Sequence, residues 1–244
     1  MDVYWLEQSA ADVPAENDWL SASEMLFLNG LRFAKRRDDW RLGRWTAKRA
    51  LASFLDIPAQ PRTLAKIEIR PALSGAPEVF VANSPADLTI SLSHRAGVAA
   101  CAVARTEIDL GCDLEMIEPR SDAFLADYFT DEEQAMVRQS PVADRSRLLA
   151  LLWSAKESAL KALREGLRLD TRSVAVTLEH ETCDVNGWRL LNVRHAEGRL
   201  FHGWWQCADG TVRTLVADPP PNAPIHLTIA ALSQPDCRLC LEDW

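Results

Sequence analysis

The hydrophobic pattern of the chain predicts a pair of helices followed by strands, and it does so twice. Apolar residues recur at helical spacing over 21–37 and 39–55, and again over 130–139 and 144–165. Alternating or continuous short apolar runs follow each pair and predict strands. These are 67–70, 79–81, 88–93 and 98–103 in the first half, and 108–115, 173–179, 187–194, 199–207, 211–217 and 225–232 in the second. The pattern predicts an α+β fold with mostly antiparallel sheets.

A short sequence at the end of each helical pair is repeated. Residues 45–51 read WTAKRAL and residues 153–159 read WSAKESA, 108 residues later. A capping-box pattern stands about twenty residues ahead of each copy, Ser21 with Glu24 and Thr130 with Glu133. The repeat predicts two similar halves, residues 1–105 and 106–244, with the boundary near residue 106.

One difference between the two copies is a reversal of charge. The first copy carries Arg49 where the second carries Glu157. A duplicated scaffold with opposite charges at equivalent positions can build a site between its halves, basic on one wall and acidic on the other.

Composition and length are those of a soluble globular protein. The 244 residues suit one large domain or two smaller ones, with 48% hydrophobic and 25% charged residues. The sequence has no apolar run of the roughly 18–20 residues that span a bilayer, and no signal peptide at its start. We therefore expect a cytoplasmic location. The six cysteines are scattered, and Cys237 and Cys240 have no second ligand pair, so structural thiols are expected.

Negative charge is concentrated in the second half of the chain. Residues 1–105 carry 13 basic and 12 acidic side chains, whereas residues 106–244 carry 14 and 23, for a net charge of −8. A general nucleic-acid binder is usually basic overall. The charge therefore argues against a nucleic-acid partner.

Three carboxylates are candidates for a metal site. Alternation along 108–115 places Asp113 and Glu115 on the same face of a strand, with Asp109. Glu157 lies on a helix one turn from Trp153 and one turn from Lys161. Taken alone, the strand pair also fits a solvated edge, and Glu157 with Lys161 also fits a surface ion pair. Together, three oxygen ligands without His or Cys suit Mg²⁺ or Mn²⁺ and not zinc.

Basic residues are dense in the first half. A solvated helical face would explain them, but several phosphate groups also demand such a density. His94 follows an alternating strand and is a candidate proton acceptor. The basic side chains within residues 32–49 are Arg32, Lys35, Arg36, Arg37, Arg41, Arg44, Lys48 and Arg49.

Four segments of the sequence resemble the Sfp-type 4′-phosphopantetheinyl transferases. They are Gly43-Arg44, ISLSH at residues 90–94, GCDLE at 111–115 and WSAKESALK at 153–161, in the order and spacing of that family. The resemblance covers about residues 20–170. The chain departs from the family pattern at Gly75-Ala76-Pro77, where Gly-Lys-Pro is frequent, and at Arg95, where a small residue is common.

The resemblance implies a monomeric, pseudo-twofold α+β protein that binds coenzyme A between its halves. It implies an acyl or peptidyl carrier protein as partner and no membrane or nucleic acid. The metal ligands would be Asp113, Glu115 and Glu157. The groups that bind coenzyme A would be Lys35, Arg36, Arg44, Arg70, Ser93, His94 and Lys161.

The implied reaction transfers the 4′-phosphopantetheine group of coenzyme A to a serine of an apo carrier protein and releases adenosine 3′,5′-bisphosphate. The catalytic residues would be Glu157, Lys161 and His94, with Glu157 taking the serine proton directly or through water. Two alternatives remain open: a metal-dependent phosphohydrolase, and a non-catalytic regulator that binds coenzyme A. For carrier docking, the sequence offers Arg164, Arg168 and the segment 124–129.

Overall fold

The computed structural model describes residues 1–105, 108–165, 168–183 and 186–229. The helices are α1 (Ala22–Gly30), α2 (Ala34–Phe54), α3 (Pro61–Leu64), α4 (Asp122–Tyr128), α5 (Asp131–Gln139) and α6 (Val142–Ala162), with short 3₁₀ turns at Ala10–Asp12 and Thr171–Ser173. The strands are β1 (Tyr4–Ser9), β2 (Ile67–Pro71), β3 (Pro77–Val81), β4 (Ser84–Pro85), β5 (Leu88–Arg95), β6 (Val98–Arg105), β7 (Asp109–Met116), β8 (Val174–Cys183), β9 (Arg189–His195), β10 (Leu200–Ala208), β11 (Thr211–Asp218) and β12 (Ile225–His226).

The strands form two large sheets and one small one. The first large sheet has the order β12-β1-β6-β5 and the second has the order β7-β11-β10-β9-β8. Neighbours within them pair antiparallel, except that β12 runs parallel to β1. Strands β2, β3 and β4 make the small sheet. This arrangement confirms the predicted α+β class.

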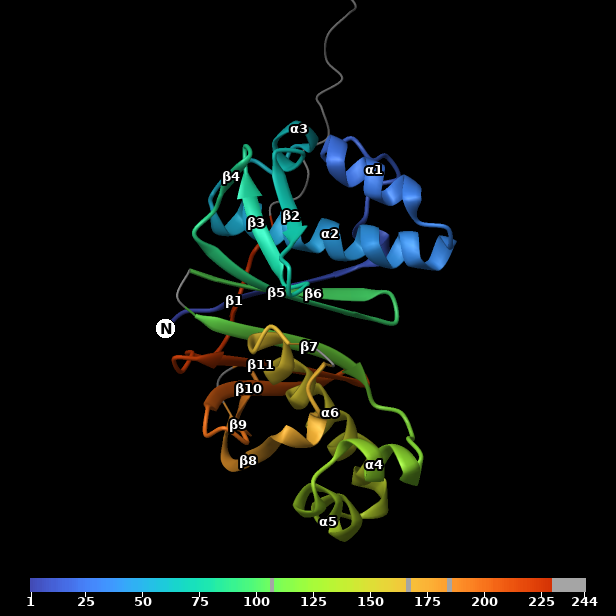
Figure 1. Ribbon diagram of the computed structural model, residues 1–244, viewed down its shortest axis with the longest axis vertical. Coiled ribbons are helices and arrows are strands. Elements are labelled where there is room, and N and C mark those ends of the chain that lie inside the picture. The colour runs from blue at the N-terminus through green and yellow to red at the C-terminus, as the bar shows by residue number, and fades with distance from the viewer. Residues whose placement is uncertain (106–107, 166–167, 184–185, 230–244) are drawn as a thin grey trace, which may run out of the picture.

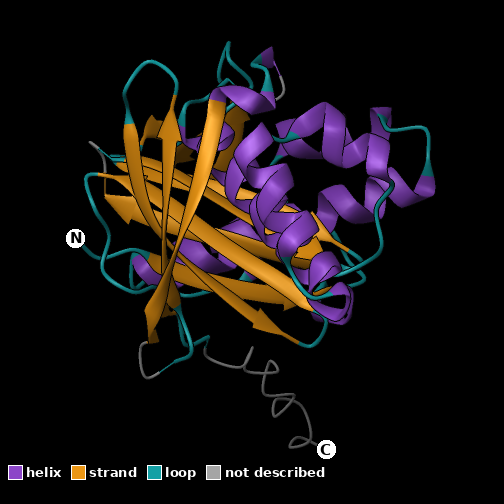
Figure 2. Ribbon diagram, turned by 90° about the horizontal axis from the view of Figure 1, so that it is seen from below, coloured by secondary structure: helices purple, strands orange, loops and turns teal. Residues whose placement is uncertain are grey.

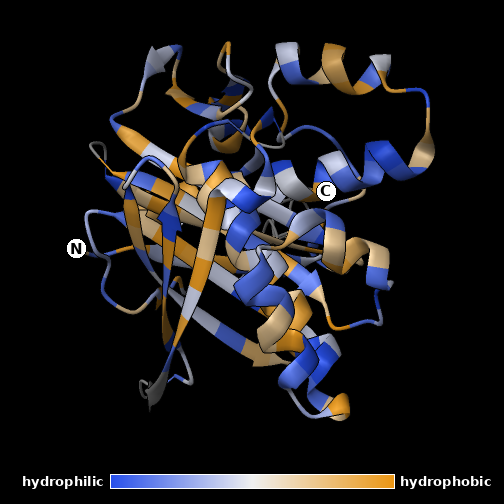
Figure 3. Ribbon diagram, turned by 60° about the horizontal axis from the view of Figure 1, so that its bottom comes forward, coloured by the Kyte–Doolittle hydropathy of each residue, from blue (hydrophilic) through white to orange (hydrophobic). Residues whose placement is uncertain are grey.

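The two large sheets pack face to face, and each carries one long helix on its outer face (Figures 1 and 2). Helix α2 covers the first sheet and α6 covers the second. Between the sheets lies an apolar layer that includes Trp5 and Ala102 from one side and Leu110 and Leu215 from the other. Figure 3 shows hydrophobic segments along these strands. The order of layers is therefore helix, sheet, sheet, helix.

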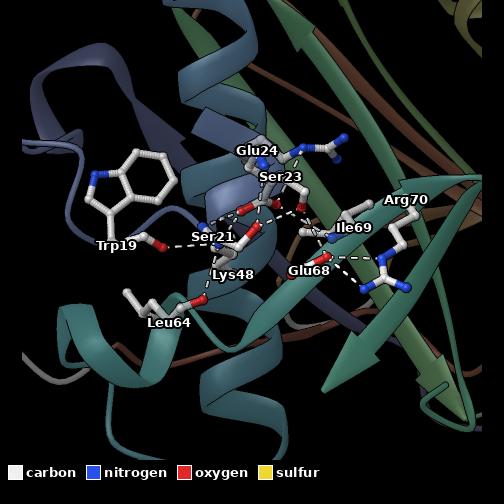
Figure 4. Close-up of polar contacts among 10 residues, drawn as sticks. Trp19, Ser21, Ser23, Glu24, Lys48, Leu64, Glu68, Ile69 and Arg70 are labelled. Atoms are coloured by element: carbon white, nitrogen blue, oxygen red, sulfur yellow. Dashed lines mark hydrogen bonds and ion pairs between the residues drawn. The ribbon is translucent and has the colours of Figure 1, made fainter. Parts of the chain in front are cut away.

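The repeated lysine of the first half lies in a buried ion pair with the glutamate of the capping box (Figure 4). Lys48 Nζ lies 2.5 Å from Glu24 Oε2 and donates to the carbonyls of Trp19 at 3.0 Å and Leu64 at 3.1 Å. The backbone N–H of Ser21 also donates to Glu24 Oε2, at 3.1 Å. Burial lowers the pKa of Lys48 and Glu24 opposes that shift.

The second half repeats the arrangement. Lys156 Nζ lies 2.8 Å from Glu133 Oε2 and donates to the carbonyls of Thr171 and Val174. The backbone N–H of Thr130 donates to Glu133 Oε2 at 2.9 Å, and that of Val176 donates to Glu133 Oε1 at 3.0 Å. The part of the repeat that both copies keep therefore builds an internal anchor between the paired helices and the following strands.

Element boundaries differ from the sequence-based prediction in several places. The expected helix over 21–37 ends at Gly30, and its basic end belongs to α2, because residues 31–33 are extended between the two. The pattern missed β1 and the short elements α3, β4 and α4. The last strand covers only Ile225–His226, and it joins the sheet of the first half. The boundary near residue 106 and the Cys237–Cys240 pair lie outside the described residues, so the division into halves stays a prediction.

Within the described residues, none of the helices combines the length and apolar character needed to cross a bilayer. The cytoplasmic location and the monomeric state stay predictions.

Candidate functional site

The two halves meet along the edges of their sheets, where β5 lies beside β7. An edge strand has backbone groups without ladder partners, and side chains can satisfy them. Ser91 Oγ accepts from the N–H of Cys112 at 2.9 Å, and Ser93 Oγ accepts from the N–H of Leu114 at 3.1 Å. The serines of the ISLSH segment thus fix the position of β7 against the first half.

Gly111 lets α6 approach β7 closely. A Cβ at this glycine would stand 1.7 Å from the carbonyl oxygen of Ser158, which no side chain could tolerate. The close approach brings Glu157, the neighbour of Ser158, over the strand face that carries Asp113 and Glu115.

Asp113 and Glu157 each present a buried oxygen without a donor. Asp113 is 6% exposed, and its Oδ1 accepts from Ser93 Oγ and from Lys161 Nζ, both at 2.8 Å. Its Oδ2 and the Oε1 atom of Glu157 are buried and accept no hydrogen bond from the described residues. Unsatisfied buried carboxylate oxygens are costly, so this pair suits a bound cation.

Glu115 is buried like Asp113 but is already engaged. Arg120 Nη2 lies 2.6 Å from its Oε1, and Arg95 Nη2 lies 3.4 Å from the same oxygen. Both arginines also contact Glu118, at 3.0 Å and 2.7 Å.

The pKa values of Glu157 and Glu115 are raised above the ordinary value of a glutamate. Burial raises the pKa of Glu157, and Asp113 and Glu115 add to the shift while Lys161 opposes it. Burial also raises the pKa of Glu115, against the opposing effect of Arg95. A carboxylate with a raised pKa is a better proton acceptor near neutral pH.

Lys161 stands between the carboxylates and a cavity. Its Nζ donates to Cys112 O at 2.9 Å and to Asp113 Oδ1 at 2.8 Å. Burial disfavours its charge, yet Asp113 and Cys112 together raise its pKa above the ordinary value. Lys161 therefore stays positively charged between the carboxylates and the cavity.

The cavity has a volume of about 970 Å³, is partly open to solvent and is lined by residues of both predicted halves. Its walls include β2, β3 and β5 from the first half, and Leu110, Lys161 and the segment after α6 from the second. Its acidic residues are Glu78 and Glu165. The basic residues that line it are Arg44, Arg70, Lys161, Arg164 and Arg168. This excess of cations suits an anionic ligand with several charges.

Two of these arginines are fixed by the first half (Figure 4). Arg70 Nε donates to Glu68 Oε2 at 2.9 Å, and its guanidinium lies 4.1 Å from the centroid of the Phe80 ring. Arg44 Nε lies 3.8 Å from Glu24 Oε1, so the buried anchor also supports a cavity cation.

The predicted site residues separate into three groups in space. Arg44, Arg70 and Lys161 line the cavity. Asp113 lies close enough to Glu115 and Glu157 to raise the pKa values of both glutamates, and Ser93 touches Asp113. Lys35, Arg36 and His94 do not line the cavity.

His94 and Lys35 lie near enough to each other for Lys35 to lower the pKa of His94. Lys35 is exposed and pairs with Asp39 at 2.6 Å, and Arg36 is exposed on the first turn of α2. His94 is also exposed, but its surroundings desolvate the ring enough to lower its pKa, helped by Lys161 and Lys35. The basic start of α2 thus faces solvent, and only Arg44 of the predicted phosphate-binding residues on this helix reaches the cavity.

The expected three-carboxylate metal site stays a prediction. Within the described parts of the chain, no group of three or more His, Cys, Asp or Glu side chains is arranged to hold a metal ion. The two unsatisfied oxygens of Asp113 and Glu157 fit a divalent cation with oxygen ligands, and Oε1 of Glu115 is contacted by Arg120 and Arg95.

Sequence analysis missed or misplaced some functional positions. Arg120 carries no sequence signal, because its role depends on the fold around Glu115. Arg164 and Arg168 are exposed and line the cavity, and their part in carrier docking stays a prediction. Phe129 is fully buried and packs in the core of the second half, which excludes it from a docking surface.

Comparison with known proteins agrees with these features. The model of the 4′-phosphopantetheinyl transferase superfamily matches residues 109–201, from β7 with Asp113 through α6 with Glu157 and Lys161. The 4′-phosphopantetheinyl transferase HetI of Nostoc sp. strain PCC 7120 is 27% identical over 162 residues, which are 65% of each chain. The chain thus spans 65% of the length of this curated relative.

Among solved structures, a holo-(acyl-carrier-protein) synthase from Bacillus anthracis in complex with CoA (3′,5′-ADP) matches 42% of this chain and 92% of its own. The identity is 19% and the TM-score is 0.35. The Sfp-type subclass stays a prediction. The family match and the curated relative show that the chain is similar to the 4′-phosphopantetheinyl transferase superfamily, and the family match includes the segment that carries the carboxylates.

Proposed function

We propose that the protein transfers the 4′-phosphopantetheine group of coenzyme A to a serine of an apo carrier protein. The observation that carries the proposal is Lys161, whose Nζ contacts Asp113 while its side chain lines the basic cavity. A ligand in the cavity would thus bring a phosphate to the carboxylates. HetI has this activity by name, and the synthase from B. anthracis was solved with coenzyme A.

Coenzyme A fits a site that consists of a basic cavity next to a group of carboxylates. The cavity can hold the adenosine, with its 3′-phosphate within reach of Arg44, Arg70 or Arg168. Leu110 lines the cavity and Asp113 follows three residues later on β7, about 10 Å along an extended strand. The diphosphate would therefore lie beside Lys161, with the reacting phosphorus near Asp113 and Glu157.

A divalent cation fits the free oxygens of Asp113 and Glu157. When bound, Mg²⁺ would neutralise the charge of the diphosphate. Asp113 is held in place by Ser93 and Lys161. Glu157, with its raised pKa, accepts the proton of the carrier serine directly or through water, and Lys161 stabilises the departing phosphate.

The carrier protein would approach the exposed surface at the end of the site near His94. There, α1 and the start of α2 expose Phe27 and Phe33, with exposed fractions of 55% and 72%, next to the basic side chains of Lys35 and Arg36. An apolar surface rimmed by cations suits an acidic partner with an apolar contact. Phe27→Ala and Phe33→Ala should raise KM for the carrier and leave KM for coenzyme A unchanged. Unchanged carrier kinetics in both variants would show that the carrier binds elsewhere.

The test of the function is the mass of a carrier protein after incubation. Apo carrier, coenzyme A and Mg²⁺ are mixed with the protein, and intact mass spectrometry measures the carrier. A transferase adds one phosphopantetheine group and releases adenosine 3′,5′-bisphosphate. A phosphohydrolase changes only coenzyme A, and a coenzyme A-binding regulator changes neither. A panel of acyl and peptidyl carriers, all of them unmodified, would refute the proposal.

A further inference from the structure

One arginine of the cavity is held from behind by a glutamate that lies outside the cavity wall. Arg70 Nε donates to Glu68 Oε2 at 2.9 Å, and Arg70 Nη2 lies 2.8 Å from the same oxygen. Arg70 Nη2 also donates to Asn83 Oδ1 at 3.2 Å, and the Phe80 ring covers one face of the guanidinium. Arg70 lines the cavity, whereas Glu68 is not among the described residues that line it. Glu68 can therefore influence a bound ligand through Arg70 or through its charge, but not by contact.

Glu68 is itself fixed by the start of α1 (Figure 4). Ser23 Oγ donates to Glu68 Oε2 at 3.2 Å, and Ser21 Oγ lies 2.9 Å from Ser23 Oγ. Ser21 caps α1 and belongs to the buried anchor around Glu24. Partial burial disfavours the charge of Glu68, yet the hydrogen bonds from Arg70 and Ser23 bring its pKa below the ordinary value. Glu68 is therefore a carboxylate that links the buried start of α1 to Arg70.

The second half has the buried anchor without this network. In each half the anchor glutamate accepts from a strand N–H, that of Ile69 at 3.5 Å in the first and that of Val176 at 3.0 Å in the second. These contacts align the two strands, and the capping boxes align the two helices. The residues that correspond to Ser23, Glu68 and Arg70 are then Glu132, Ala175 and Thr177. Because the second half builds the anchor without them, the three side chains beside the cavity serve another purpose.

We propose that Glu68 is a positioning residue that orients Arg70 toward the phosphate groups of coenzyme A. This deepens the proposed function and rests on it for the identity of the ligand. An unattached arginine side chain loses rotamer freedom when it binds a ligand, and that loss weakens affinity. Glu68 and Phe80 order Arg70 before the ligand arrives. Within the described residues, the hydrogen bonds of Arg70 use Nε and Nη2, so Nη1 remains for a phosphate oxygen.

The negative charge of Glu68 makes the sign of one effect decisive. If Glu68 acted only through its charge, its removal would make the cavity more positive, and coenzyme A would bind more tightly. If Glu68 orients Arg70, its removal weakens binding. Glu78 supplies the matched control, because it lines the same cavity and is the register partner of Arg70 on β3. Among the ion pairs of the described residues, none joins Glu78 to Arg70, which pairs with Glu68.

The experiment measures the Kd of coenzyme A for the full chain by calorimetry, with Mg²⁺ and without carrier protein. Glu68→Ala should raise Kd about tenfold, as expected when a charge-assisted contact is partly lost, and Ser23→Ala about twofold. Glu78→Ala should leave Kd unchanged or lower it. Glu68→Gln keeps an acceptor for Arg70 Nε, so it should weaken binding less than Glu68→Ala does. In the Arg70→Ala background, Glu68→Ala should cause no further weakening, because the effect passes through Arg70.

Three results would overturn the proposal. The first is a Glu68→Ala variant that binds coenzyme A as tightly as wild type or more tightly. The second is a loss on Glu68→Ala that persists in full in the Arg70→Ala background, and the third is a wild-type protein that does not bind coenzyme A. Thermal unfolding identifies any variant that has lost its fold. If Glu68→Ala has done so, Glu68→Gln and Ser23→Ala replace it in the same comparison with Arg70→Ala.

The outcome is separate from that of the proposed transfer reaction. Because no carrier protein is present, the calorimetry tests only the binding of coenzyme A and the role of Glu68 in it. The carrier mass assay alone tests transfer. Binding that depends on Glu68 through Arg70, together with unmodified carriers, would support this inference and refute the transferase assignment.

Discussion

The contact between Gly111 and α6 provides the sharpest test of how the fold positions the site. Ordinary van der Waals contact begins at 3.4 Å, and a Cβ at residue 111 would lie 1.7 Å from Ser158 O. In Gly111→Ala, β7 and the backbone of α6 must therefore move apart by about 1.7 Å. The displaced atom is backbone of α6, so a rotamer change cannot absorb the shift. Glu157 precedes Ser158 and should move away from Asp113 together with the helix.

Two losses should follow in Gly111→Ala. Overpacking of this kind lowers the free energy of unfolding by about 1–3 kcal/mol. Misplacement of a catalytic group by about 1 Å costs up to roughly 100-fold in rate. Denaturant unfolding measures the first, and the initial rate of carrier modification at a temperature where the variant is folded measures the second.

Two other glycines supply matched controls. Gly43 lies within α2 with nothing within 4 Å of an added Cβ, so Gly43→Ala should be neutral or stabilising. Gly203 on β10 would place its Cβ 2.1 Å from Leu215 O, so its clash is with the neighbouring strand β11 and not with the backbone of α6. Gly203→Ala should therefore lose stability and keep its rate when folded. If Gly203→Ala lost as much rate as Gly111→Ala, or if Gly111→Ala kept wild-type rate and stability, the reasoning would be wrong.

Three further predictions concern single charges. Lys156→Met leaves Glu133 buried without its partner, so the free energy of unfolding should fall by about 3–5 kcal/mol, as measured in urea; a change below 1 kcal/mol would contradict the anchor role. Glu157→Gln removes a carboxyl whose raised pKa makes the folded state bind its proton more tightly than the unfolded state does. In the wild type, the stability contributed by that proton is present below the ordinary pKa of 4.5 and is lost as the pH rises through the raised pKa of Glu157. In thermal unfolding with EDTA present, Glu157→Gln should therefore have a higher Tm than wild type at pH 7 and the same Tm at pH 4. Arg70→Ala should weaken coenzyme A binding by about 1.5–3 kcal/mol and weaken dephospho-coenzyme A binding less, as measured by calorimetry. Arg36→Ala should change the binding of neither ligand. Equal losses for both ligands in Arg70→Ala would place the 3′-phosphate elsewhere.

Local patterns in the sequence determined the elements and much of the acidic site. The α+β class was predictable because helical and alternating periodicity are properties of short segments. Asp113 and Glu115 could be assigned to one face of a strand for the same reason. The charge reversal at Glu157 was visible only through the repeat, and the structure does bring Glu157 close to those carboxylates.

Local sequence patterns did not predict the environment of the two repeated lysines. The sequence marked Lys48 and Lys156 as the shared part of the repeat, but it gave no sign that both are buried with the capping-box glutamates. The paired residues are separated by 24 positions in the first half and by 23 in the second, so the pairing depends on how two helices and the next strand pack. The same limitation concealed the apolar, buried environment of Phe129.

Only the tertiary structure decided which charged residues act together. Lys35 and Arg44 belong to the same basic run, yet one is exposed and the other lines the cavity, because a helix turns successive residues to different sides. Arg95 reaches Glu115 from the end of β5, and Arg120 reaches it from the segment after β7. Periodicity fixes the face of its own element on which a side chain lies, but contact between elements depends on the packing of both. For that reason the residue types of the site could be read from the sequence, while the division of labour between Asp113, Glu157 and Glu115 could not.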